Sequence, residues 1–202
     1  MQFLWRCPGQ PVRLGILPGS FNPPTKAHLA LAQAALAEVD EVALVLPRAF
    51  PHKRYVGANF TQRATMLRAA VASCPGLSAA ASDGGLFVEI AQECRAAYGA
   101  GAQLTFVCGR DAAERIESWD NADPHAFDRM LEVFQLLVAS REGSYRPPPH
   151  LGHAIRALGV PTGLIGISAS EVRRRVRAGL DWEHLVPATI VPLVREIYRP
   201  PA

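Results

Sequence analysis

The chain has 202 residues, of which 49% are hydrophobic and 19% are charged, as in a globular protein with one well-covered core. Its formal net charge of +3 is too small to indicate a nucleic-acid partner, although a sequence pI of about 8.8 suits a protein that binds anionic metabolites. The sequence contains no run of eighteen or more apolar residues and no charged N-terminal region followed by an apolar segment. We therefore expect a cytoplasmic protein without a membrane partner.

Residues 1–11 are rich in proline and glycine and are predicted to be a lead-in segment. An apolar strand over residues 12–17 follows and ends before Gly19. After two consecutive prolines, a helix is expected to begin at Thr25, because apolar residues then recur at helical spacing. The next apolar run, residues 41–46, has no polar residue after its first glutamate and is predicted to be a buried strand.

The middle of the chain alternates between helix and strand. Apolar residues at helical spacing predict helices over residues 61–73 and 87–98, and a glycine ends the second of them. Residues 77–81 show a weak strand pattern, whereas residues 103–108 show a strong one.

A helix is expected directly after Gly109. A continuous apolar strand is predicted over residues 134–139. A polar, proline-rich loop over residues 140–149 comes next. It is expected to lead into a helix over residues 150–158 and a short strand over residues 164–167.

Two helices are predicted to close the chain. The first spans residues 168–178, and Ser168 and Glu171 have the spacing of a capping box at its start. The second runs from Pro187 toward Tyr198, and an internal proline is expected to bend it.

Continuous apolar strands that alternate with helices indicate an α/β fold. We predict a Rossmann-like parallel sheet with helices on both faces and a small C-terminal helical portion. No internal repeat or linker is visible, so residues 1–202 are predicted to form a single domain. Ligands of such sheets bind beyond the carboxyl ends of the strands. The loops over residues 18–28, 47–55 and 109–119 each follow a strand and are therefore expected at that edge.

The segment from Gly15 to Leu29 combines a strand, a glycine turn and a helix start. Backbone N–H groups at a helix start have no partner within the helix, and the helix dipole favours a negative charge there. Thr25 can cap the helix, and His28 lies three residues later on the same face. This arrangement suits a phosphate. The residues alone leave open a second interpretation, in which Thr25 is only a cap and His28 is only a half-buried polar residue.

The segment Ile167-Ser168-Ala169-Ser170-Glu171-Val172-Arg173 is the second candidate for phosphate binding. It places two hydroxyl groups and an arginine at a helix start. Four arginines between residues 173 and 177 step around the helix by about 100° per residue, so at most one or two of them can face a single ligand. The alternative is a capped helix with a solvated basic face.

Two signatures carry a resemblance to a known family. Gly-Ser-Phe-Asn-Pro-Pro-Thr-x-x-His, residues 19–28, resembles the nucleotide-binding signature of the nucleotidyltransferase superfamily, and within it of the nicotinate/nicotinamide mononucleotide adenylyltransferases. Ala27 stands where many members have glycine. The segment at residues 167–173 resembles the family's Ile-Ser-Ser-Thr-x-Ile-Arg, with Ala169 in place of a serine. Two signatures in the right order are much more specific than either alone.

The resemblance implies a set of site residues. Those expected to bind ATP are Gly19, Ser20, Phe21, Thr25, His28, Gly109, Asp111, Ile167, Ser168, Ser170 and Arg173. Within this set, His28, Thr25 and Arg173 are expected to be catalytic. Those expected to bind the acceptor are Asn22, His52, Lys53 and Trp119. No residue is expected to be a metal ligand. For His52, Lys53 and Trp119, an exposed loop or simple packing is the alternative.

The implied activity is transfer of the adenylyl group of ATP to nicotinate or nicotinamide mononucleotide, with release of pyrophosphate, in NAD biosynthesis. Both partners are small molecules, and Mg²⁺ is expected to enter with ATP and to bridge phosphate oxygens mostly through water. The mononucleotide phosphate attacks directly, so the protein needs no nucleophile.

Residues 83–87 read Asp-Gly-Gly-Leu-Phe where many bacterial members have a Ser-Tyr-Thr segment near the nicotinate ring. This difference leaves other acceptors open, such as phosphopantetheine or a sugar or alcohol phosphate, and CTP as the donor. A nucleotide-binding regulator without turnover is a further alternative. His150 and His153 have a spacing that could serve a metal, but no further ligands of a zinc set accompany them.

Overall fold

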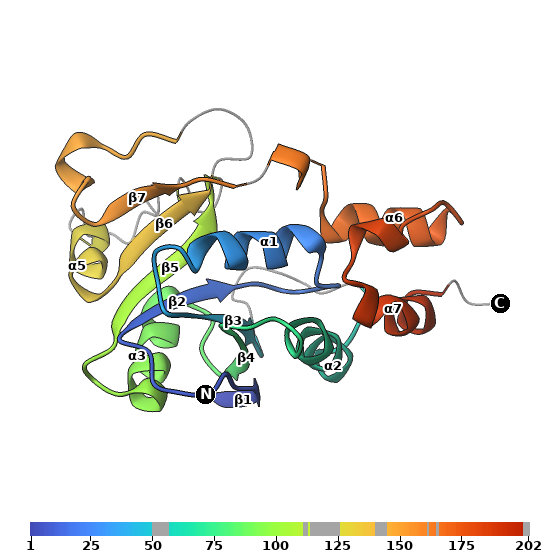
Figure 1. Cartoon of the computed structure of the whole chain (residues 1–202), viewed down its shortest axis with the longest axis horizontal. Coiled ribbons are helices and arrows are strands. Elements are labelled where there is room, and N and C mark those ends of the chain that lie inside the picture. The colour runs from blue at the N-terminus through green and yellow to red at the C-terminus, as the bar shows by residue number, and fades with distance from the viewer. Residues whose placement is uncertain are drawn as a thin grey trace.

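The computed structural model describes residues 1–49, 57–110, 113, 126–139, 145–160, 162–164 and 166–199. Within these residues seven strands form one sheet: β1 (Gln2–Trp5), β2 (Arg13–Pro18), β3 (Glu41–Pro47), β4 (Leu77–Ser82), β5 (Gln103–Gly109), β6 (Gln135–Ala139) and β7 (Ile155–Leu158). Their order is β1-β4-β3-β2-β5-β6-β7, and every neighbouring pair is parallel except β1 and β4. The predicted α/β class is confirmed (Figure 1).

The winding of the sheet reverses at β2. The chain passes from β2 to β3 and β4 on one side, and then returns to β5, β6 and β7 on the other. β2 and β5 are direct neighbours, with Ile16 beside Phe106. In open parallel sheets, ligands bind in the crevice beyond the carboxyl ends of the strands at such a reversal. The loops that follow Pro18 and Gly109 therefore begin where this fold favours a binding site.

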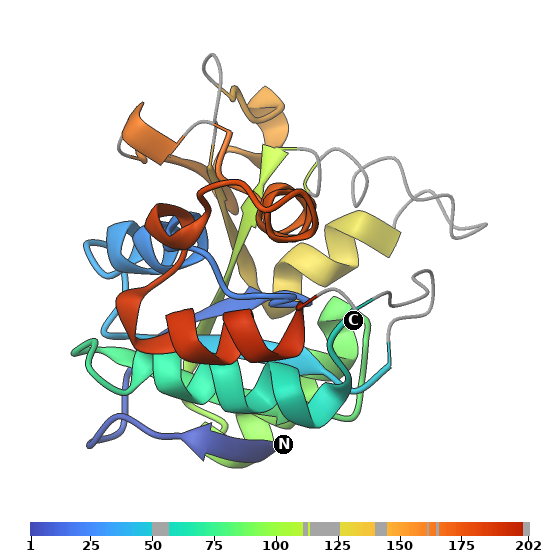
Figure 2. The same ribbon diagram turned by 90° about the vertical axis from the view of Figure 1, so that its right-hand side faces the viewer.

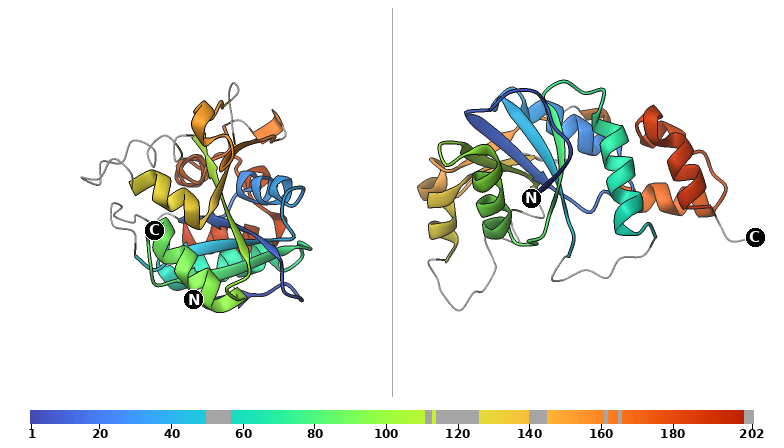
Figure 3. Two further views of the ribbon diagram at one scale, coloured as in Figure 1. Left: turned by 90° about the vertical axis from the view of Figure 1, so that its left-hand side faces the viewer. Right: turned by 90° about the horizontal axis from the view of Figure 1, so that it is seen from below.

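Helices cover both faces of the sheet. α1 (Lys26–Ala35) lies on one face, and α3 (Phe87–Tyr98) and α5 (Ala126–Val133) lie on the other, as the left panel of Figure 3 shows. Each face has its own apolar cluster, because the strands are buried on both sides. None of the helices in the described part of the chain is long and apolar enough to cross a membrane.

The C-terminal helices α6 (Ala169–Arg177) and α7 (Val191–Ile197) pack against α2 (Phe60–Val71). Val172 of α6 and Val194 of α7 belong to a third apolar cluster that also contains residues of α2. Figure 2 shows α7 alongside α2, with α6 seen nearly end-on above them. The small C-terminal helical portion is thus present, and α2 joins it to the rest of the fold.

Most predicted elements agree with the structure to within two residues. These are the strands at 12–17, 41–46, 77–81, 103–108 and 134–139 and the helices at 61–73, 87–98 and 168–178. α5 has no counterpart among the predicted elements.

Two predictions at the edges of the sheet are wrong. The first, the lead-in over residues 1–11, contains β1, which pairs with β4 and places Phe3 opposite Ala80. The second, the helix over residues 150–158, is replaced by a 3₁₀ turn and β7. Both strands have only four residues, too few to carry a clear local pattern, and their conformation depends on pairing with another strand, β4 for β1 and the preceding strand β6 for β7.

Two predictions near the C-terminal end are also wrong. In the strand expected at residues 164–167, none of the described residues (Leu164, Gly166 and Ile167) is in a strand, and Thr162–Leu164 form a 3₁₀ turn instead. The last helix begins at Val191 rather than at Pro187. Pro192 consequently lies in the first helical turn, where its missing N–H costs no hydrogen bond, and it does not bend the helix.

Candidate active site

The turn after β2 brings the end of that strand against the start of α1. Gly19 donates its backbone N–H to the carbonyl of Val45 in β3 (3.0 Å). Phe21 follows with a φ of 44°, in the left-handed region, and its side chain is fully buried. A bulky residue rarely adopts this conformation, and such residues concentrate at functional sites. The Phe21 ring lies edge-on to the His28 imidazole, with the ring centroids 5.2 Å apart.

We expect that Gly19 cannot be replaced even by alanine without loss of stability. A Cβ atom at this position would lie 2.9 Å from Cζ of Phe21, and that ring is held by burial and by His28. Gly19→Ala should lower the free energy of unfolding by about 1–3 kcal/mol, the usual cost of overpacking. The control is Gly101→Ala, because a Cβ atom there meets nothing within 4 Å. Urea denaturation measures the free energy of unfolding of both variants. An equal decrease in Gly19→Ala and Gly101→Ala would contradict the expectation.

Thr25 and His28 form a reciprocal cap at the start of α1. The Thr25 side chain accepts from the His28 backbone N–H, and the Thr25 backbone N–H donates to His28 Nδ1 (3.0 Å). The Thr25 hydroxyl also lies 2.7 Å from Nδ1. A backbone N–H can only donate, so Nδ1 must be the acceptor and the imidazole proton must be on Nε2. The cap therefore fixes both the ring orientation and the tautomer.

The start of α6 meets the same turn. Ser168 is the N-cap of α6, and its side chain accepts from the Glu171 backbone N–H (3.1 Å). Arg173 donates through Nη1 to the backbone carbonyl of Asn22 (2.5 Å) and through Nη2 to Ser170 Oγ (3.1 Å). The two segments that the sequence analysis singled out, 19–28 and 167–173, are thus joined directly.

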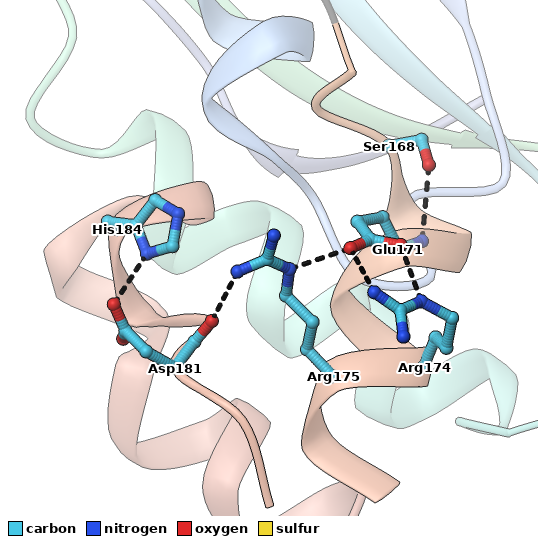
Figure 4. A network of polar contacts seen from close by, with 6 residues as sticks. All are labelled: Ser168, Glu171, Arg174, Arg175, Asp181 and His184. Carbon is cyan, nitrogen blue, oxygen red and sulfur yellow. Dashed lines mark hydrogen bonds and ion pairs between the residues drawn. The ribbon is translucent and has the colours of Figure 1, made fainter. Parts of the chain in front are cut away.

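Two other arginines of α6, Arg174 and Arg175, pair with a carboxylate of the same helix. The Glu171 carboxylate pairs with Arg174 (2.7 Å) and Arg175 (2.6 Å), as Figure 4 shows. The hydrogen bonds from Arg174 and then Arg175 lower the pKa of Glu171 to about 2. The prediction that Glu171 forms the second half of a capping box is therefore wrong. Its side chain turns along the helix toward the arginines instead. Arg173 is the arginine of this helix that contacts the turn.

Known proteins resemble this chain over nearly its whole length. The sequence model of cytidylyltransferase-like proteins matches residues 16–175. A protein of Bordetella avium, described as a probable nicotinate-nucleotide adenylyltransferase, is 33% identical over an alignment of 202 positions. The alignment covers 93% of this chain and 98% of the relative. The chain belongs to the nicotinate-nucleotide adenylyltransferase family. A relative with the same description from Citrifermentans bemidjiense is 30% identical, covering 92% of this chain and 96% of its own length.

A solved structure shares the fold of this family member. It is the Plasmodium falciparum nicotinic acid mononucleotide adenylyltransferase complexed with NaAD, with a TM-score of 0.68 and 16% sequence identity. The match covers 92% of this chain and 97% of the Plasmodium chain. At this identity the likeness concerns the fold alone.

One buried residue of the site was missed by the sequence analysis. Arg63 of α2 is 2% exposed and donates through Nη1 to the backbone carbonyl of Ser20 (3.1 Å). It lies on the buried face of the helix with Met66, Leu67 and Ala70. A charged residue at helical spacing within an apolar stripe was the signal that could have identified it.

Asn22 was predicted to contact the acceptor, but its amide oxygen is engaged by the protein. Asn22 is 4% exposed, and Oδ1 accepts hydrogen bonds from the Ala58 backbone N–H (3.3 Å) and from the Tyr198 hydroxyl (2.5 Å). Its role toward the acceptor stays a prediction. Tyr198 was also missed, and its separation of 176 residues from Asn22 leaves no local signal in the sequence.

The remaining predicted residues divide into two groups. Gly109 ends β5, beside the strand that leads into the turn, and Ile167 packs against the C-terminal apolar cluster. His52, Lys53, Asp111 and Trp119 lie outside the described residues, so their assignments stay predictions.

The segment at residues 83–87, which differs from the family pattern, has its backbone donors occupied by carboxylates. The Gly84 N–H donates to Glu93 Oε1 (2.8 Å). The N–H groups of Gly85 and Leu86 donate to Glu89 Oε2 at 2.8 and 2.9 Å. These three amides are therefore engaged within the protein, and the Glu93 carboxylate also pairs with the N-terminal ammonium group (3.0 Å).

The described residues contain no group of three or more histidine, cysteine, aspartate or glutamate side chains that could hold a metal ion. His150 and His153 do not form a metal site with any other side chain that the structure describes. His153 Nδ1 instead lies 3.1 Å from the His150 backbone carbonyl, and both residues are exposed.

Proposed function

We propose that this protein transfers the adenylyl group of ATP to nicotinate mononucleotide in NAD biosynthesis. An oxygen of the mononucleotide phosphate attacks the α-phosphorus of ATP, and the bond from that phosphorus to the oxygen that bridges to the β-phosphate breaks. The dinucleotide forms and pyrophosphate leaves with the bridging oxygen. The protein binds both anions in line and stabilises the charge that spreads over the phosphate oxygens.

The observation that carries the proposal is the contact between Arg173 and the backbone of Asn22. It brings two helix starts, each capped by a hydroxyl residue and rich in outward-facing N–H groups, to one place at the sheet reversal. A triphosphate is long enough and negative enough to use both. The relatives from Bordetella avium and Citrifermentans bemidjiense are both described as probable nicotinate-nucleotide adenylyltransferases, and these descriptions support the same reaction.

The geometry suggests a role for each residue of the joined segments. The Nε2–H of His28 donates to the α-phosphate as negative charge develops, because the cap commits Nδ1 to Thr25. The backbone around Ser20 and Phe21 lines the same pocket. Ser168, Ser170 and Arg173 bind the β- and γ-phosphates. Arg173 has five N–H groups in a planar fork, and its two contacts with Asn22 and Ser170 use two of them.

Residues outside the described part of the chain complete the proposed site. Asp111 binds the ribose hydroxyls of ATP, while Lys53 pairs with the phosphate of the mononucleotide. His52 and Trp119 line the acceptor pocket.

We propose that Mg²⁺ enters with the triphosphate. The donor set of the described residues lacks a carboxylate cluster, and Mg²⁺ is commonly held by substrate phosphates and water. When bound, it neutralises part of the phosphate charge. The protein residues that would adjoin it are the phosphate-binding groups of α6.

The segment at residues 83–87 favours a second candidate, a family member with a different acceptor. Glu89 and Glu93 occupy its amides, so a negatively charged ring substituent would find none of those three donors there. Nicotinamide mononucleotide, which has a neutral ring substituent, depends less on such donors.

Pyrophosphate release in the presence of Mg²⁺ tests the proposal. ATP and CTP should each be offered with nicotinate mononucleotide, nicotinamide mononucleotide and phosphopantetheine. We expect the highest kcat/KM for ATP with nicotinate mononucleotide. Preference for the nicotinamide compound would support the second candidate. Pyrophosphate release with none of these pairs, together with measurable ATP binding, would replace both with a regulator that does not turn over.

A further inference from the structure

Four segments that are distant in the sequence meet at Asn22. They are the turn after β2, the residues before α2, the middle of α6 and the end of α7. We infer that the hydroxyl of Tyr198, just after α7, is a positioning residue for the nucleotide site, where it holds the turn that precedes Thr25 and His28. This inference rests on the proposed function only for its effect on turnover; its effect on ATP binding is independent of the acceptor.

The contacts at Asn22 account for both of its oxygens. The side-chain oxygen accepts from the Tyr198 hydroxyl (2.5 Å) and from the Ala58 backbone N–H (3.3 Å). The backbone carbonyl accepts from Arg173 Nη1 (2.5 Å). Three donors from three parts of the chain therefore converge on one residue of the turn.

Tyr198 is placed to donate rather than to accept in this contact. It is 8% exposed, and burial raises the pKa of its hydroxyl, so that the group keeps its proton over the whole neutral range. An amide oxygen offers only lone pairs, which makes the Tyr198 hydroxyl the donor. The ring belongs to the apolar cluster shared by α2, α6 and α7, which holds the hydroxyl in position.

The backbone at Gly57 is shaped to admit Tyr198. Gly57 has a φ of +109°, a conformation that other residues rarely adopt. A Cβ atom there would lie 3.2 Å from Cε1 of Tyr198, 3.3 Å from Asn22 Oδ1 and 3.5 Å from Cδ of Arg173. The absence of a side chain at Gly57 allows these three residues to meet.

The position of Asn22 in the chain links this contact to the nucleotide site. Asn22 lies directly after Phe21, whose ring contacts His28, and three residues before Thr25, the cap of α1. If the turn loses a fixed point, the helix start and the imidazole are in binding geometry for a smaller fraction of the time. The apparent Kd for ATP then rises in inverse proportion to that fraction.

Tyr198→Phe tests the inference, because it removes the hydroxyl and keeps the ring. The matched control is Tyr98→Phe. Tyr98 is also buried, and its hydroxyl donates to the carboxylate of Glu41 (2.7 Å) at the amino end of β3, whereas the turn contacts Val45 near the carboxyl end of that strand. Both variants lose one buried hydrogen bond, and both are expected to have a lower melting temperature.

We expect Tyr198→Phe to raise the Kd for ATP by roughly tenfold, the value for a turn that is in its binding conformation about a tenth of the time. The Kd is measured by calorimetry well below the melting temperature. kcat/KM for ATP should fall by a similar factor. Tyr98→Phe should leave both values within about twofold of the wild type. Unchanged ATP binding in Tyr198→Phe, or an equal loss in both variants, would overturn the inference. If the wild type binds ATP but forms no dinucleotide, the proposed function fails, and the Kd comparison still decides the role of Tyr198.

Discussion

His28→Ala is expected to lower kcat by about 10²–10³-fold, as for the loss of one preorganised donor to a developing oxyanion. The reason is the tautomer: Nδ1 accepts from the Thr25 backbone, so the imidazole proton is on Nε2, which is the group proposed to donate to the α-phosphate. Pyrophosphate release under saturating substrates measures the effect. Activity within about threefold of the wild type would exclude this role for His28.

Alanine at this position also removes half of the cap of α1, so the loss of activity could come from an altered helix start. His28→Gln separates the two effects. A glutamine at the third helical position can accept from the N-cap backbone, and the chain already uses this arrangement in α2, where the Asn59 N–H donates to Gln62 Oε1 (2.9 Å). We expect His28→Gln to melt close to the wild type and to remain as inactive as His28→Ala. Recovery of turnover in the glutamine variant would show that the cap, and not the imidazole, matters.

Arg173→Ala is expected to lower kcat/KM for ATP by about 10²-fold or more. This guanidinium joins the start of α6 to the turn at Asn22 and is proposed to bind the distal phosphates, so its loss removes both a charge-assisted contact and a geometric link. Arg173→Lys should recover little of the activity, because an ammonium group cannot make the two forked contacts.

The neighbouring arginine provides the control. Arg174 is exposed and pairs with Glu171, away from the turn. Arg174→Ala should change kcat/KM by less than about twofold, and exposed ion pairs of this kind contribute little to stability. Equal losses in Arg173→Ala and Arg174→Ala would indicate a general effect of positive charge on α6 instead of a specific contact.

The parts of the fold that the sequence could predict are those with local causes. The central strands are continuous apolar runs such as residues 41–46, and all seven residues of β3 are buried. The caps of α1 and α6 follow from the chemistry of Thr25 and Ser168. β1 and β7 could not be predicted in the same way, because four residues carry little pattern, and the partner of β1 also lies far away in the chain.

The site shows the same division. The two segments proposed to bind phosphate could be found because each contains its cap, its hydroxyl groups and its charge within ten residues. Arg63 could have been found as a charge within an apolar stripe. Tyr198 could not, since its effect on the turn depends on how α7 packs against α2 and on the space that Gly57 leaves.

The long separations at Asn22 have a consequence for how the protein is made. Its contacts with Arg173 and Tyr198 span 151 and 176 residues. A ribosome must therefore synthesise nearly the whole polypeptide before the proposed nucleotide site can be complete. If ATP binds at this site as proposed, it can stabilise the fold only after the C-terminal helices have been made.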